Sequence, residues 1–105
     1  MAISDTTLWL DVSNYDMPTF DAACFRANGV DALIVGRQRP NDARAMIQAA
    51  KAAGLPVKGV YAFLYFGLDT VGQTQAAIDV AREFGVPRVW LDVEATPPNE
   101  AAGRT

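Results

Sequence analysis

The sequence predicts an α/β protein in which four parallel strands alternate with helices, a βαβαβαβ arrangement that corresponds to half of a (β/α)8 barrel. Apolar segments of strand length alternate along the chain with longer segments that have helical periodicity. A glycine follows each helical segment, at Gly29, Gly54 and Gly85, where glycine typically ends a helix. The helical segments, of about 11 to 15 residues, are long enough for the right-handed crossovers that join parallel strands.

Four strands are predicted, at residues 6–12, 31–36, 56–64 and 89–94. The second, Asp31–Gly36, is continuously apolar after its first residue, which is typical of a strand covered on both faces. The other three alternate between two kinds of side chain, so their two faces are expected to differ.

Polar residues before each helical segment predict where the helices begin. Asp16 is a candidate N-cap with Pro18 near the first helical position, and that helix is expected to reach Asn28. Asn41 is expected to cap a second helix, which runs to about residue 53. Thr70 and Gln73 have the spacing of a capping box at the start of the third.

Each helical segment carries an apolar stripe that is expected to face the sheet. The members are Phe20, Ala23, Cys24 and Ala27, then Ala43, Met46, Ile47 and Ala50, and finally Val71, Thr74, Ile78, Ala81 and Phe84. Cys24 is therefore predicted to be a small buried hydrophobe and not a nucleophile.

The strand faces favour a barrel over an open doubly wound sheet. One face is aliphatic, which suits packing against helices. The other carries aromatic and acidic residues near the strand ends, which suits a barrel interior that opens on an active site. In an open sheet, both faces would meet helices and the acids would need a crevice at a switch point in the strand order.

A complete barrel of this kind needs roughly 200 residues or more, and this chain has 105. Residues 1–96 are predicted to form the half-barrel domain, and residues 97–105 a tail or the start of a truncated fourth helix. Half a barrel leaves two open strand edges. Either the chain is a fragment of a longer product, or copies pair through these edges as a homodimer or higher homo-oligomer.

Composition excludes several classes of function. The net charge of −3 argues against nucleic-acid binding, and no apolar run is long enough for a transmembrane helix. The absence of histidine excludes histidine triads and histidine-ligated metals, and one cysteine allows no internal disulfide. No nucleotide-binding glycine motif is present, so neither a cofactor nor a metal is expected. No secretory signal is visible, which leaves the location open.

The segment from Val89 to Glu94 is the strongest candidate for chemistry. As a strand, it places Trp90, Asp92 and Glu94 on one face, with the two acids roughly 6.5 to 7 Å apart at Cα. This distance lies within the range of about 5 to 9.5 Å that separates the carboxyl groups of glycosidases.

Several motifs in order resemble those of the glycoside hydrolase family 25 lysozymes, the Chalaropsis-type muramidases. They are Leu10-Asp11-Val12-Ser13, Ala52-Ala53-Gly54-Leu55-Pro56-Val57, Gly59-Val60-Tyr61 and Leu91-Asp92-Val93-Glu94. The chain differs at Ala62, where the family usually has histidine after the tyrosine. It also differs at residues 36–40, where the family usually has a Lys-Ala-Thr-Glu-Gly-like segment.

The resemblance implies hydrolysis of the β-1,4 bond between N-acetylmuramic acid and N-acetylglucosamine in peptidoglycan. It implies that Glu94 is the general acid, that Asp92 is its carboxylate partner and that Asp11 sets the charge of the same cleft. Tyr61 would hydrogen-bond near the reaction centre. The remaining predicted substrate-binding residues are aromatic: Trp9, Phe63, Tyr65 and Trp90.

Two alternatives remain. The chain is a non-catalytic, self-associating half-barrel that at most binds glycan through its aromatic residues, or it is an unrelated small α/β domain in which the acids cap helices. Arg37 and Arg39 are more readily explained by a solvated loop than by contact with a muropeptide carboxylate.

Overall fold

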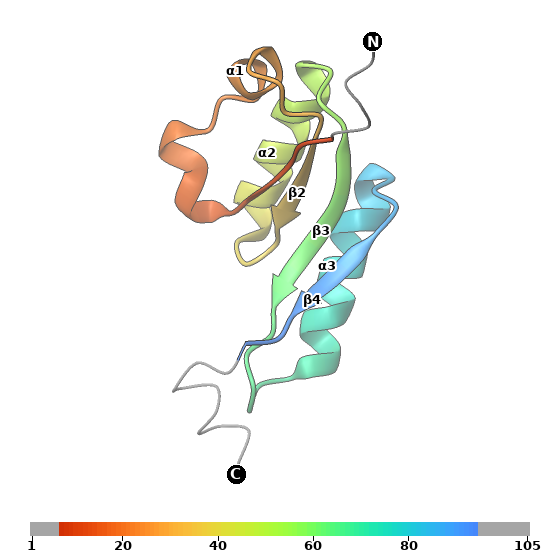
Figure 1. Cartoon of the computed structure of the whole chain (residues 1–105). Helices are drawn as coiled ribbons and strands as arrows, with labels where there is room; N and C mark the ends of the chain where they lie inside the picture. The colour runs from red at the N-terminus through yellow and green to blue at the C-terminus, as the bar shows by residue number, and fades with distance from the viewer. Residues whose placement is uncertain (1–6, 95–105) are drawn as a thin grey trace.

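The computed structural model describes residues 7–94, which form one sheet with helices packed against it. The strands are β1 (Trp9–Val12), β2 (Ala32–Gly36), β3 (Val57–Phe63) and β4 (Val89–Asp92). The helices are the 3-10 helix η1 (Asn14–Thr19) and the α-helices α1 (Ala22–Ala27), α2 (Pro40–Ala52) and α3 (Thr70–Phe84) (Figure 1).

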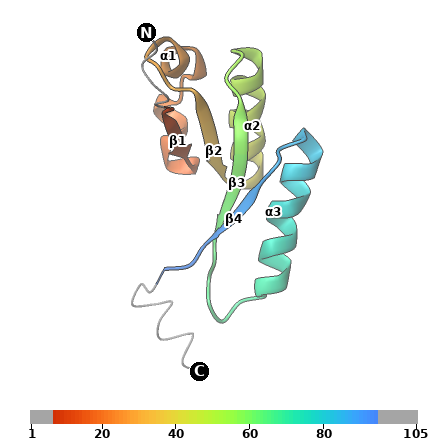
Figure 2. The ribbon, with the colours of Figure 1, turned by 45° about the vertical axis from the view of Figure 1, so that its right-hand side comes forward.

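All neighbouring strands are parallel, and their order in the sheet is β1-β2-β3-β4, the same as in the chain. The predicted succession of four parallel strands and intervening helices is therefore confirmed. The order has no reversal, so the described strands contain no switch point of the kind found in a doubly wound sheet. Figure 2 shows the strong twist of the sheet between β1 and β4.

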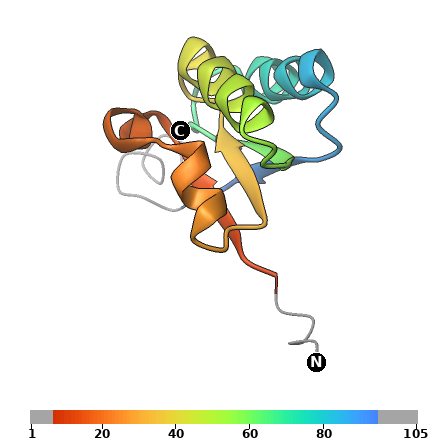
Figure 3. The same cartoon turned by 90° about the horizontal axis from the view of Figure 1, so that it is seen from above.

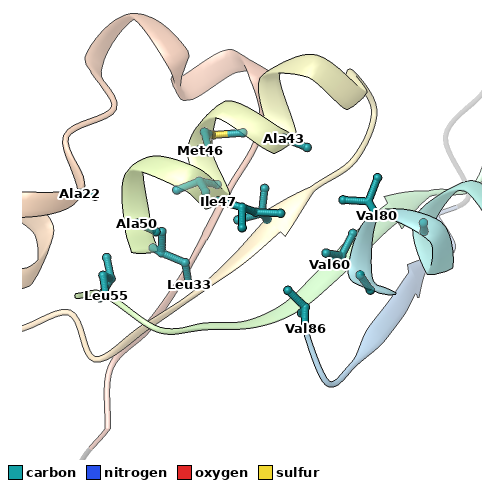
Figure 4. Close-up of a cluster of buried hydrophobic side chains, with 14 of the residues drawn as sticks. Ala22, Leu33, Ala43, Met46, Ile47, Ala50, Leu55, Val60, Val80 and Val86 are labelled. Carbon is teal, nitrogen blue, oxygen red and sulfur yellow. The ribbon is translucent and has the colours of Figure 1, made fainter. Parts of the chain in front are cut away.

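The helices α2 and α3 lie on the same side of the sheet, as the view from above shows (Figure 3). The core fills the space between them and the strands. Its largest fully buried side chains are Leu33, Val35, Met46, Ile47, Leu55 and Val60, most of which are labelled in Figure 4. The predicted stripe of α2 is confirmed, since Ala43, Met46, Ile47 and Ala50 are all buried.

The glycine stops are confirmed at all three helices. Gly29, Gly54 and Gly85 have φ values of 92°, 72° and 66°, a region that L side chains rarely adopt. After α3, the Val86 N–H donates to the Ala81 carbonyl at 2.8 Å, the bond that closes a Schellman motif. Val86 is buried, and β4 begins three residues later, at Val89.

The predicted first helix is wrong in its start and its buried face. Ser13, not Asp16, is the N-cap of η1, and Asp16 is the third residue of the same capping box. Phe20 then returns to extended backbone, and a new helix begins with Asp21 as its cap, whose carboxylate accepts from the Cys24 N–H at 3.0 Å. This new start rotates the helix so that Ala22 is buried and Cys24 is exposed.

Two other predicted caps are also wrong. Arg39 precedes α2 without a side-chain cap, and Pro40 occupies the first turn, where its missing N–H costs no bond. Asp69, not Thr70, caps α3 by accepting from the Gly72 N–H at 2.9 Å. Val71 lies in the first turn of that helix and is 77% exposed instead of facing the sheet, whereas Ala77, Val80 and Ala81 are buried.

Strand ends differ slightly from the predicted ranges. The fourth strand ends at Asp92, so Glu94 follows the strand. Residues 1–6 and the predicted tail at 97–105 lie outside the described part of the chain. Within the described residues, no helix is long and apolar enough to cross a membrane.

Candidate active site

A hollow lies on the sheet face opposite the core, where the carboxyl ends of the strands come together. It has a volume of about 530 Å³ and draws its lining from all four strands. The lining residues are Asp11, Ile34, Tyr61, Trp90, Asp92 and Glu94. The hollow therefore gathers the three predicted carboxylates, Tyr61 and Trp90.

Strand register explains why these side chains meet. Asp11 lies beside Ile34, and Tyr61 lies between Gly36 and Trp90 in neighbouring strands. Aligned residues in a parallel sheet share a face. This face is opposite the helices, so polar groups at the strand ends remain accessible.

Two glycines make room for the large aromatic side chains. A Cβ atom on Gly36 would lie 2.7 Å from Cζ of Tyr61, and a Cβ atom on Gly59 would collide with the ring of Trp90. Each ring therefore rests directly on the backbone of a preceding strand. This close packing holds the rings of Tyr61 and Trp90 near the surface of the sheet, on the side that faces the hollow.

Asp92 and Glu94 interact directly. A hydrogen bond to Asp92, the negative charge of Asp92 and partial desolvation raise the pKa of Glu94 above its ordinary value. The bond requires that the carboxyl oxygens lie in contact, closer than the 5 to 9.5 Å or so that separates glycosidase carboxyls. Asp11 lies in the same hollow but is not among the groups that raise the pKa of Glu94.

Tyr61 is partly buried at the base of the hollow. Burial and the nearby Asp11 raise the pKa of its phenol, with smaller contributions from Asp16 and Asp92, whereas a side-chain hydrogen bond with Ser13 lowers it. The phenol therefore remains protonated at neutral pH and is available as a hydrogen-bond donor.

Three of the predicted aromatic site residues do not line the hollow. Trp9 is 39% exposed and lies at the start of β1, two residues before Asp11. Phe63 and Tyr65 contact each other, with ring centroids 4.9 Å apart. Gln73 accepts from the Tyr65 N–H at 2.9 Å, which holds this pair near the first turn of α3.

Several residues of the site were missing from the sequence-based prediction. Ile34 forms part of the hollow, Ser13 hydrogen-bonds to Tyr61, and Gly36 is the floor under Tyr61. The alternation of side chains between the two faces of a strand could have assigned Ile34 to the face of the hollow. Both faces of Asp31–Gly36 are apolar, so the sequence did not distinguish them.

The segment after β2 approaches the same region. The side-chain oxygen Oε1 of Gln38 and Nε of Arg37 are buried and have no hydrogen-bond partner among the described residues. The Arg37 backbone N–H donates to the Tyr61 carbonyl at 2.8 Å. Arg39 is exposed, which agrees with its interpretation as part of a solvated loop.

The acids of the hollow do not form a metal centre by the usual criterion. Within residues 7–94, no group of three or more histidine, cysteine, aspartate or glutamate side chains is arranged to hold a metal ion.

Comparison of the chain with models of protein families, with curated proteins and with solved structures found no match. The resemblance to family 25 lysozymes therefore remains a prediction that rests on the motifs.

Proposed function

We propose that this chain forms the acid-bearing half of a (β/α)8-type glycoside hydrolase that cleaves the β-1,4 bond between N-acetylmuramic acid and N-acetylglucosamine in peptidoglycan. The observation that carries the proposal is the hollow, where three carboxylates, a tyrosine and a tryptophan meet at the carboxyl ends of parallel strands. This is the place where (β/α)8 enzymes hold their catalytic residues.

The contact between Glu94 and Asp92, which raises the pKa of Glu94, supports a general-acid role for Glu94. A general acid must keep its proton near neutral pH and release it as the glycosidic oxygen leaves. The pKa of Glu94 is shifted upward, in the direction that the first need requires. Once Glu94 has transferred the proton, Asp92 stabilises positive charge at the anomeric carbon or orients the substrate N-acetyl group.

The aromatic residues give the proposed substrate an apolar surface. Trp90 lines the hollow and is 38% exposed as a residue, although its ring rests on Gly59. A sugar ring stacked on Trp90 would lie beside Asp92, at the end of the same strand, and Glu94, which follows it. Tyr61 would donate a hydrogen bond to the substrate from the neighbouring strand.

Loss of turbidity in a suspension of bacterial cell walls tests the proposal. The wild-type chain is expected to clear the suspension, and Glu94→Gln to reduce the rate by about 10²- to 10⁴-fold, as expected for loss of a general acid. Glu83→Gln is the matched control, because Glu83 pairs with Arg44 between α3 and α2, outside the hollow. Absence of clearing by the wild type between about pH 4 and 8 would contradict catalysis by this chain.

A second candidate function is self-association without catalysis, with at most weak glycan binding. Its supporting observation is that β1 and β4 are the outer strands of the described sheet, on a chain that leaves Trp9 and Trp90 more than a third exposed. Two copies related by a two-fold axis parallel to the strands would pair β4 with β1 twice. The result is eight strands, the number in a closed (β/α)8 barrel.

Light scattering over a concentration series and calorimetric titration with a chitin oligomer separate the two candidates. Self-association predicts a mass that increases with concentration and no wall clearing. Glycan binding that Trp90→Ala removes would show that the exposed ring contacts sugar. A monomer that binds no oligomer at any concentration tested would contradict the second candidate.

A further inference from the structure

Ser13 connects the end of β1 to the hollow. Its backbone is extended, with φ −139° and ψ −176°, so the side-chain alternation of β1 continues through it. Its side chain therefore lies on the same face as Asp11. Because Val12 aligns with Val35 of β2, Ser13 follows on beside Gly36, over which the Tyr61 phenol packs. A hydrogen bond between the Ser13 side chain and this phenol lowers the pKa of Tyr61, which lines the hollow on β3.

The capping box of η1 holds Ser13 in place. The Ser13 N–H donates to Oδ2 of Asp16 at 2.7 Å, and the Ser13 hydroxyl oxygen accepts from the Tyr15 N–H at 3.3 Å. One lone pair of that oxygen is thus occupied by a backbone donor. The hydroxyl proton remains available for donation to a second group.

The phenol of Tyr61 packs closely over the Gly36 backbone. The Gly36 backbone lies directly beneath it, where a Cβ atom would be 2.8 Å from its hydroxyl oxygen. The Tyr61 carbonyl is also bound, by the Arg37 N–H at 2.8 Å. The phenol oxygen is therefore presented to Ser13 on one side and to the hollow on the other.

We propose that Ser13 is a positioning residue, which donates its hydroxyl proton to the Tyr61 oxygen and so directs the Tyr61 hydroxyl proton into the hollow. A phenol oxygen has a single proton. When the oxygen accepts from Ser13, that proton points to another acceptor, and the acids that face Tyr61 in the hollow are Asp11 and Asp92. Ser13 thus makes Tyr61 a fixed donor toward the acids or toward a ligand that replaces them.

The role of that donor in catalysis rests on the proposed function, but the direction of the hydrogen bond does not. Asp16 acts one step further away, because its carboxylate orients the Ser13 backbone and not the phenol itself. The three residues Asp16, Ser13 and Tyr61 therefore form a chain of contacts from the surface helix η1 to the hollow.

Titration of the Tyr61 phenol in the full 105-residue chain tests the direction of the bond. The signal of Tyr61 is identified by difference from a Tyr61→Phe variant, since Tyr15 and Tyr65 also titrate. Ser13→Ala is expected to shift the midpoint of Tyr61 upward, because the phenolate loses its donor. Ser13→Thr, which keeps a hydroxyl and a capping oxygen, is expected to restore the wild-type midpoint.

Ser13→Gly is the second variant, to be used if Ser13→Ala does not fold. Glycine at an N-cap costs only a few tenths of a kcal/mol relative to serine. Circular dichroism establishes that each variant is folded at the pH of measurement. An unchanged or lowered Tyr61 midpoint in a folded Ser13→Gly protein would overturn the proposal. So would a Ser13→Thr protein that titrates like the alanine variant.

Wall clearing measured on the same variants separates the two proposals. If Tyr61 shifts as expected but the wild type clears no wall suspension, the positioning role stands and the proposed function fails. If the wild type clears walls and Ser13→Gly leaves the Tyr61 midpoint unchanged, the positioning role fails and the proposed function stands.

Discussion

At the scale of single residues, most of the proposed chemistry depends on two acids, Asp92 at the end of β4 and Glu94 just after it. The sequence predicted that Asp92 and Glu94 share a face, and both line the hollow. It did not predict their hydrogen bond, because side-chain torsions decide whether carboxyls that are two residues apart meet. The same limit applies to Ser13 and Tyr61, which lie on different strands and whose contact no local pattern indicates.

Asp92→Asn is expected to lower the pKa of Glu94. The substitution replaces a hydrogen-bonded carboxyl and its negative charge, the two largest causes of the raised value, with a neutral amide that can donate to the Glu94 carboxylate. Carbon-detected NMR titration of the Glu94 side chain measures the change. As the pH is raised, Glu94 should then lose its proton at a lower pH than in the wild type. Any hydrolysis that needs protonated Glu94 should decline at that lower pH as well.

Asp11→Asn is the matched control for this titration. Asp11 lines the same hollow but is not among the groups that raise the pKa of Glu94. A larger shift of the Glu94 midpoint in Asp11→Asn than in Asp92→Asn would show that Asp92 is not the main cause of the raised pKa of Glu94.

Gly59→Ala is expected to displace Trp90 and to destabilise the fold. The added methyl group has no space beneath the indole ring, and overpacking of this kind costs about 1 to 3 kcal/mol. The change should appear as a lower midpoint of chemical denaturation and as altered Trp90 fluorescence in a Trp9→Phe background. Lys58→Ala, at the exposed neighbouring position, should leave both signals almost unchanged. Equal stability of the Gly59 and Lys58 variants would contradict the close contact.

Elements were predicted more accurately than their caps. Apolar runs and glycine stops identified four strands and the ends of three helices, because burial and positive φ restrict the residue types that fit. The starts of the first and third helices were wrong because several residues that can cap a helix occur close together there. The start of α2 was wrong because this helix follows Arg39 without a side-chain cap, one residue before Asn41. In residues 13–21, Pro18 and the return of Phe20 to extended backbone divide one predicted helix into two elements.

The cap of α3 provides a direct test at this level. Asp69→Ala removes the carboxylate that accepts from the Gly72 N–H at 2.9 Å, and it should lower the free energy of unfolding by about 1 kcal/mol. Thr70→Ala, at the cap position that the sequence had predicted, should change it by much less. Denaturant titration of both variants measures the difference. A larger loss for Thr70→Ala would place the helix start one residue later.

At the scale of the whole molecule, the strand order connects the fold to the site. Because β1 to β4 follow one another without reversal, the helix side of the sheet holds the core and the other side carries Tyr61, Trp90 and the acids. The alternation of side chains along the strands was sufficient to predict this division. The same order leaves β1 and β4 at the edges of the described sheet.

The outer edge of β4 decides whether copies of the chain pair through their strands. The Arg88 carbonyl accepts from the Val60 N–H of β3 at 3.0 Å, and the Asp92 carbonyl accepts from the Leu64 N–H, just after β3, at 2.9 Å. Backbone groups alternate in direction along a strand, so those of Leu91 point away from β3. Leu91→Pro would remove the outward N–H without breaking the β3–β4 ladder, since proline is tolerated on a sheet edge in that orientation.

If β4 pairs with β1 of a second copy, light scattering of the wild type should show a mass that increases with concentration, and Leu91→Pro should remain a monomer throughout. Leu91→Ala is the control, because it shortens an exposed side chain and keeps the N–H. It should associate almost as strongly as the wild type, since the ladder of backbone hydrogen bonds provides the pairing. Association of a folded Leu91→Pro protein at wild-type strength would exclude β4 as the contact.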